Sequence, residues 1–173
     1  AGIIIPPEGY LRRVAEICRA HRVLLVADEI QSGLGRTGKL FTYEYEGVTP
    51  DMVTVGKALS GGFYPVSAVL ASKEVLGILK PGDHGSTFGG NPLAAAIART
   101  ALRVLVEERL VERSAEIGAY FMSRLGAIAS GAVKEVRGRG LWIAIELDRP
   151  ARPYCEALMR EGVLCKETHD RVI

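Results

Sequence analysis

The sequence has few cysteines, and they are scattered. Cys18, Cys155 and Cys165 are the only three in 173 residues, and no C-x-x-C pair is present. This spacing argues against a disulfide framework and favours a reducing compartment. We therefore expect a cytoplasmic protein, or one of the mitochondrial matrix if the source is eukaryotic. Because the three histidines are far apart and Cys165 with His169 is only half of a metal site, we expect no metal.

An excess of charge and long apolar runs are also missing. Lys and Arg number 22 against 20 for Asp and Glu, and a net charge of +2 creates no long-range field for nucleic acid or an anionic membrane. The apolar run VLLVA ends at a charge, far short of the roughly 18 to 20 residues of a membrane-spanning helix. We therefore expect neither nucleic acid nor membrane as a partner. A content of 48% hydrophobic residues excludes disorder.

Neither terminus has the signals that usually begin or close a domain. The chain opens with AGIIIPPEGY, which has no initiator Met and no targeting segment. It ends with KETHDRVI, in which the start of a strand is not followed by a turn. We interpret both ends as cuts within a longer protein.

Helical and strand patterns alternate through the first part of the sequence. The spacing predicts an α/β fold with a mostly parallel sheet and helices over residues 1–110, followed by part of a smaller α+β domain over residues 111–173. Asn91 and Pro92 are a typical N-cap and first residue of a long helix. The predicted helices are 10–22, 92–110, 114–128 and 151–162. The predicted buried strands are 23–30 and 51–56, residues 65–72 are a third strand candidate, and residues 133–147 form a two-stranded ribbon.

The segment GLGRTGK (33–39) has the glycine and lysine spacing of a phosphate-binding loop. Leu40 follows it, where such a loop needs a Ser or Thr hydroxyl for Mg²⁺. The acidic strand lies only a few residues upstream, whereas the two motifs normally come from separate strands. The pattern therefore favours a glycine-rich turn over a nucleotide site.

Two side chains of opposite charge follow neighbouring predicted strands. Asp28 ends VLLVAD, and Lys57 follows DMVTVG directly. Taken singly, Asp28 fits a helix cap and Lys57 a solvated loop. Flanking apolar and small residues instead predict a partly buried amine with a lowered pKa. Together, a lysine and an aspartate at adjacent strand ends are what a pyridoxal phosphate site needs, because the lysine bonds the aldehyde and the aspartate keeps the ring nitrogen protonated.

Three motifs in order carry a resemblance to a known family. LLVADEIQSGLGRTG, DMVTVGKALSGG and GSTFGGNPL closely resemble the class III, fold-type I aminotransferases. Within that class, VKEVRGRG and ARPYCEALMREGVLCKETHD are similar to ornithine aminotransferases. The resemblance covers essentially all 173 residues.

The resemblance implies a role for each of five residues. Lys57 would form the covalent bond with pyridoxal 5'-phosphate and later shuttle a proton, and Asp28 would pair with the ring nitrogen. Ile30 would pack on one face of the ring, and Gln31 would hydrogen-bond its phenolic oxygen. Thr87 would bind the cofactor phosphate of the other subunit, which implies a homodimer with a shared active site.

The implied reaction converts L-ornithine and 2-oxoglutarate into glutamate 5-semialdehyde and glutamate. Acetylornithine and 4-aminobutyrate are alternative amino donors, and a non-catalytic dimerisation remnant of the fold is an alternative of a different class. The resemblance also places the phosphate-binding turn and the residues that hold the substrate outside Ala1–Ile173. We therefore expect the isolated chain to have little or no transaminase activity.

Overall fold

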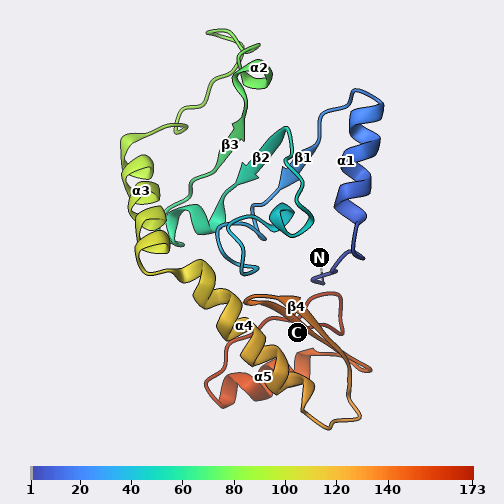
Figure 1. The fold of residues 1–173 in the computed structure, drawn as a ribbon. Helices are drawn as coiled ribbons and strands as arrows, with labels where there is room; N and C mark the ends of the chain where they lie inside the picture. Colours follow the sequence, from blue (N-terminus) through green and yellow to red (C-terminus); the bar gives the residue numbers. More distant parts are fainter. Residues whose placement is uncertain (1) are drawn as a thin grey trace.

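The computed structural model of the chain describes residues 2–173 and contains two groups of elements (Figure 1). The first holds the N-terminal helix, a three-stranded sheet and a long helix, and the second holds a two-stranded ribbon between two helices. The elements are α1 (Tyr10–Ala20), β1 (Val26–Asp28), η1 (Thr42–Glu46), β2 (Met52–Val55), η2 (Lys57–Ser60), β3 (Ala68–Ala71), α2 (Lys73–Leu76), α3 (Pro92–Glu107), α4 (Leu110–Gly126), β4 (Val133–Arg139), β5 (Trp142–Leu147) and α5 (Arg152–Arg160).

The sheet of the first group has the order β1-β2-β3. Strands β1 and β2 are parallel, with Asp28 opposite Thr54, while β2 and β3 are antiparallel. All three strands lie inside the ranges predicted from the sequence, although each is shorter. The parallel pair brings the ends of β1 and β2 to the same edge of the sheet.

The sequence predicted that strands 23–30 and 51–56 are buried on both faces, and this prediction is wrong. Val53 and Val55 are buried, whereas Val26 on β1 and Val69 on β3 are 49% and 46% exposed. The reason is that packing covers only one face: the core cluster joins the β2 valines to Leu34, Leu59 and α3. Burial along β2 consequently alternates instead of running continuously.

The long helix α3 begins as the sequence predicted. The Asn91 side chain accepts a hydrogen bond from the Ala94 N–H at 2.8 Å, and Pro92 is the first helical residue. Because this cap satisfies an otherwise unpaired backbone donor, it fixes the start of the helix. Ala94 and Ala98 are the buried residues of α3, and Ala98 belongs to the core cluster of the sheet.

The second group is built on the predicted ribbon. Strands β4 and β5 pair antiparallel, and α4 lies against them. The ribbon reaches back to the first group through the glycine-rich segment 33–39, where Arg36 O accepts hydrogen bonds from Leu141 N at 3.0 Å and from the Ser114 hydroxyl at 3.2 Å. A Cβ on Gly38 would lie 3.0 Å from Ala115 of α4. The segment that imitates a phosphate-binding loop is therefore a packed turn beneath α4 and the ribbon.

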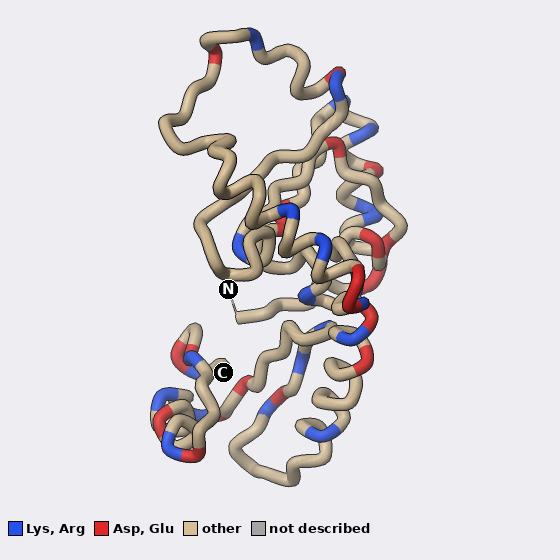
Figure 2. The backbone as a smooth tube through the Cα atoms, turned by 90° about the vertical axis from the view of Figure 1, so that its left-hand side faces the viewer, with Lys and Arg blue, Asp and Glu red and all other residues tan. Residues whose placement is uncertain are grey.

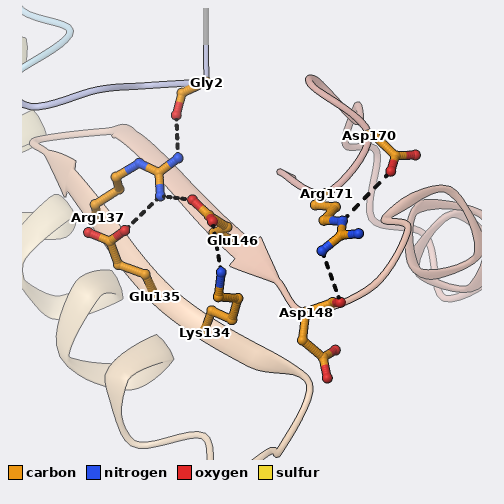
Figure 3. A network of polar contacts seen from close by, with 8 residues as sticks. All are labelled: Gly2, Lys134, Glu135, Arg137, Glu146, Asp148, Asp170 and Arg171. Atoms are coloured by element: carbon orange, nitrogen blue, oxygen red, sulfur yellow. Dashed lines mark hydrogen bonds and ion pairs between the residues drawn. The ribbon is translucent and has the colours of Figure 1, made fainter.

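The N-terminal residues also contact the ribbon (Figure 3). Arg137 donates to Gly2 O and Ile3 O, both at 2.8 Å, and its guanidinium pairs with Glu135 and Glu146. The two carboxylates hold the arginine in place, so the beginning of the chain is fixed to a strand more than 130 positions away.

Charges of both signs are interspersed along the chain (Figure 2). Neither sign collects over a whole group of elements, in line with the net charge of +2. In the part that the structure describes, no helix has the length and apolar character needed to span a bilayer.

Candidate active site

Asp28 and Lys57 lie at the same edge of the sheet. Asp28 is the last residue of β1 and is opposite Thr54, three positions before Lys57 on the neighbouring parallel strand. The carboxyl ends of parallel strands are where open α/β sheets place ligand-binding groups. The structure therefore brings together the two residues on which the predicted site depends.

The carboxylate of Asp28 is held by one of its two oxygens. Oδ1 accepts hydrogen bonds from the Thr54 hydroxyl and from the Ile30 N–H, both at 3.1 Å. Within residues 2–173, Oδ2 has no hydrogen-bond partner. Two donors thus orient the side chain, and its second oxygen stays available to accept a hydrogen bond from a ligand.

Lys57 occupies an unusual backbone conformation. Its φ is 43°, in the left-handed region that non-glycine residues rarely adopt, and it starts the short helix η2. The predicted partial burial of the amine is wrong for this chain, because Lys57 is exposed. The physical reason is the uncovered face of the sheet: the ammonium at its edge reaches solvent directly.

Lys57 lines an open pocket of about 610 Å³. One wall is the segment before β3, the other the turn before α3 and the first turn of that helix. The other lining residues are Tyr64, Pro65, Val66, Ser67, Phe88, Gly89, Gly90, Asn91, Ala94 and Ala95. None of the other four predicted site residues lines this pocket.

Ile30 approaches the residue that precedes Lys57. A Cβ built on Gly56 would lie 3.5 Å from Ile30 Cγ2, so the isoleucine packs beside the backbone that carries the lysine. Gln31 is exposed, and no hydrogen bond fixes its side chain among the described residues. Its predicted contact with a cofactor oxygen stays a prediction.

Thr87 lies in the exposed loop between α2 and α3. Its neighbour Phe88 lines the Lys57 pocket, but Thr87 does not. The role predicted for it, in the site of a second subunit, is not a contact that one chain makes, and it also stays a prediction.

Glu29 is a residue that the sequence reasoning missed. It is 4% exposed and follows Asp28 directly. Its Oε2 accepts from the Ser32 hydroxyl at 2.6 Å and its Oε1 from the Tyr43 N–H at 3.1 Å. Burial and the neighbouring charges of Glu44 and Glu29 raise the pKa of Tyr43. Strand alternation was the available signal, because it turns residue 29 to the face opposite Asp28, toward the core.

Comparison with known proteins gives a consistent result. The class III aminotransferase family matches residues 1–173. The chain is 62% identical over its whole length to an ornithine aminotransferase of Exiguobacterium sp., of which it covers 43%. Among solved structures it resembles an ornithine aminotransferase of Plasmodium yoelii (46% identity, TM-score 0.96) and an acetylornithine aminotransferase of Elizabethkingia anophelis (46% identity, TM-score 0.94).

The structural matches have the same extent as the sequence match. They cover 99% and 97% of this chain, and 47% and 44% of the two solved chains. The chain thus spans somewhat less than half the length of the relatives it matches. Because the family match extends over every residue, and the motifs that hold Asp28 and Lys57 meet at one sheet edge, this chain belongs to the class III aminotransferases.

Proposed function

We propose that the protein is a pyridoxal phosphate-dependent transaminase that converts L-ornithine and 2-oxoglutarate into glutamate 5-semialdehyde and glutamate. The observation that carries the proposal is the placement of Asp28 and Lys57 at the ends of adjacent parallel strands. The family is pyridoxal phosphate-dependent, and the relative from Exiguobacterium sp. is an ornithine aminotransferase. Residue chemistry and similarity thus support the same reaction class.

The residues at the sheet edge fit this cofactor. Within residues 2–173, the Lys57 amine has no hydrogen-bond or ion-pair partner that would compete with a covalent bond to the cofactor. Asp28 offers Oδ2 while Oδ1 is held by Thr54 and Ile30 N–H. Ile30 adds an apolar side chain next to Gly56. An amine, an oriented carboxylate and an apolar side chain are the groups that bind an aromatic aldehyde with a basic ring nitrogen.

When bound, pyridoxal phosphate supplies an electron-withdrawing ring that stabilises negative charge on the substrate carbon. The amine of Lys57 would hold it until the amino group of the substrate takes its place. Lys57 would then be a free amine, able to accept a proton from the substrate carbon and deliver it to C4′ of the cofactor. Asp28 would keep the ring nitrogen protonated, Ile30 would restrict the ring, and Gln31 would donate to the phenolic oxygen.

The partner of this chain would be a second copy. Phe63 and Phe88 are 86% and 78% exposed, and Leu93 is 57% exposed at the start of α3. Association with a second copy would cover such exposed apolar side chains. A homodimer would also give Thr87 its proposed contact with the cofactor phosphate in the opposite site.

Two further proposals concern the chain itself. The break between α3 and α4, at Glu108 and Arg109, supports a domain boundary near residue 110. Exposure of Lys57 and Asp28, in a chain with less than half the length of its relatives, supports weak or no transaminase activity of the 173 residues alone. Normal turnover of ornithine by this chain alone would contradict the second proposal.

Identification of the lysine is the decisive experiment. The full-length protein is mixed with pyridoxal phosphate, reduced with borohydride and digested, and the labelled peptide is sequenced. We expect the label on Lys57 and its loss in Lys57→Ala. Label spread evenly over exposed lysines such as Lys73 and Lys80 would instead indicate a non-catalytic remnant of the fold.

A substrate panel tests the amino donor. The similarity to the Elizabethkingia anophelis protein makes acetylornithine the main competitor. With 2-oxoglutarate as acceptor, kcat/KM for ornithine should exceed that for acetylornithine and for 4-aminobutyrate. A preference for either competitor would replace ornithine in the proposal and leave the reaction class unchanged.

A further inference from the structure

Glu29 is a buried carboxylate next to the candidate cofactor residue Asp28. It is 4% exposed, and no other Asp or Glu in the described part of the chain is buried to this degree. A carboxylate removed from water is costly unless hydrogen bonds replace the lost solvation. The contacts of Glu29 therefore indicate what its burial achieves.

Both oxygens of the Glu29 side chain accept hydrogen bonds. The Ser32 hydroxyl donates to Oε2 at 2.6 Å, which ties the side chain to its own turn, and the Tyr43 N–H donates to Oε1 at 3.1 Å, which ties it to η1. Two acceptors on one side chain satisfy two donors from different segments. An apolar residue of the same size would leave both donors unpaired.

The backbone of Glu29 is fixed as well. Its N–H donates to Thr54 O on β2, and its carbonyl accepts from Gly33 N, both at 3.0 Å. A Cβ on Gly33 would lie 2.7 Å from Glu29 O and 2.9 Å from Glu29 Cβ, so only glycine allows the turn to close this tightly. Residues 29–33 thus form a turn closed around the Glu29 side chain.

The predicted cofactor residues project from this turn and the strand end before it. Asp28 precedes Glu29, and Ile30 and Gln31 follow it. The Ile30 N–H that orients Asp28 belongs to the same turn. We propose that Glu29 is a positioning residue: its two hydrogen bonds hold the backbone that aims Asp28 and Ile30 at the cofactor. This inference rests on the proposed function.

The test compares Glu29→Ala with Glu29→Gln in the full-length protein. The alanine variant leaves the Ser32 hydroxyl and the Tyr43 N–H unpaired. The glutamine variant can keep both contacts, because its amide oxygen accepts from Tyr43 N–H and its NH₂ donates to the Ser32 oxygen. The readouts are the Kd for pyridoxal phosphate, from its visible absorption, and kcat with ornithine.

We expect Glu29→Ala to weaken cofactor binding and lower kcat by about 10- to 100-fold, the range found when a residue that orients a metal-binding side chain is removed. Glu29→Gln should restore both values to within about threefold of wild type. A Gln variant as impaired as the Ala variant would overturn the proposal, because the two hydrogen bonds would then be insufficient.

Leu147→Ala is the matched control for stability. Leu147 is 2% exposed on β5, away from the Glu29 turn, and its truncation should lower Tm without changing the Kd for pyridoxal phosphate. If Glu29→Ala behaves in the same way, with a lower Tm and unchanged Kd and kcat, Glu29 has only a structural role and the proposal is wrong.

Ser32→Ala keeps the test decisive if Glu29→Ala does not fold. It removes one of the two bonds and leaves the carboxylate in place, and we expect a smaller loss of cofactor affinity, about two- to fivefold. An unchanged affinity would contradict the proposal. If the wild-type protein does not bind pyridoxal phosphate at Lys57, both the proposed function and this inference are wrong. If the wild-type protein binds it and the variants have no effect, only the inference is wrong.

Discussion

Lys57 combines a reactive amine with a backbone conformation that L-residues rarely adopt. Its φ of 43° brings Cβ close to its own backbone, which costs about 1 kcal/mol or more. Strained residues of this kind gather at functional sites, because the surrounding structure compensates for them. Lys57 lies between the extended backbone of Gly56 and the short helix η2, of which it is the first residue. Both the strained backbone and the reactive amine of Lys57 are thus typical of a functional residue.

Replacing Lys57 by glycine or alanine separates strain from chemistry. Both variants lose the amine, so both should fail to bind pyridoxal phosphate covalently. Lys57→Gly should nevertheless be more stable than Lys57→Ala by about 1 kcal/mol, because glycine adopts positive φ without strain. Urea unfolding of the cofactor-free variants measures the difference. Lys39 has no positive φ, so there the alanine variant should be more stable than the glycine variant. If Lys57→Ala is at least as stable as Lys57→Gly, no strain is stored at position 57.

Helix α4 fits the ribbon through a glycine. Gly118 is buried in α4, and a Cβ on it would overlap with the carbonyl of Gly140 in the ribbon turn. The missing side chain lets helix and ribbon backbones approach closely. Glycine in a helix otherwise lowers stability, so its presence here reflects packing and not helix propensity.

Two alanine substitutions in α4 should have opposite effects. Gly118→Ala forces the helix away from the ribbon and should lower the free energy of unfolding by about 1–3 kcal/mol or more. Gly126→Ala, at the end of the same helix, meets no atom within 4 Å and should raise it by up to about 1 kcal/mol. Thermal unfolding followed by circular dichroism checks both. A tolerated Gly118→Ala would mean that the close approach is not needed.

The two groups of elements are held together by contacts between distant parts of the chain. Arg36 O binds Leu141 N and the Ser114 hydroxyl, and Arg137 binds the carbonyls of Gly2 and Ile3. Glu146 orients Arg137 (Figure 3), and this hydrogen bond lowers the pKa of the Glu146 carboxyl below its ordinary 4.5. The attachment of the N-terminal residues therefore depends on a charged glutamate.

Acid should weaken this attachment. A lowered pKa in the folded state means that Glu146 adds stability above the unfolded pKa and loses it as the pH falls through the folded value. The difference in Tm between wild type and Glu146→Gln should therefore be largest near pH 7, shrink below about pH 5 and vanish once Glu146 is protonated. Glu161→Gln, on an exposed residue, should show no such change. A difference in Tm that is independent of pH would contradict the role of the Glu146 charge.

Local patterns in the sequence were enough to predict most elements and the family. Leu11 and Val14 mark the apolar face of α1, Asn91 and Pro92 the start of α3, and alternation the β4–β5 ribbon. These signals are local, because helix periodicity, capping and strand alternation depend on neighbours within a few positions. The motifs around Asp28 and Lys57 are equally local, and they were sufficient for the family.

Tertiary structure decided everything that depends on a distant partner. The pairing of Asp28 with Thr54 brings the Asp28 carboxylate and the Lys57 amine to one edge of the sheet. Tyr43 gives Glu29 its second hydrogen bond, and the turn 33–39 packs against α4 and the ribbon. Packing on one face alone left Val26 and Lys57 exposed, contrary to the sequence prediction. No local pattern contains this information, because burial is set by which segments come to lie against a face, and those segments are remote in sequence.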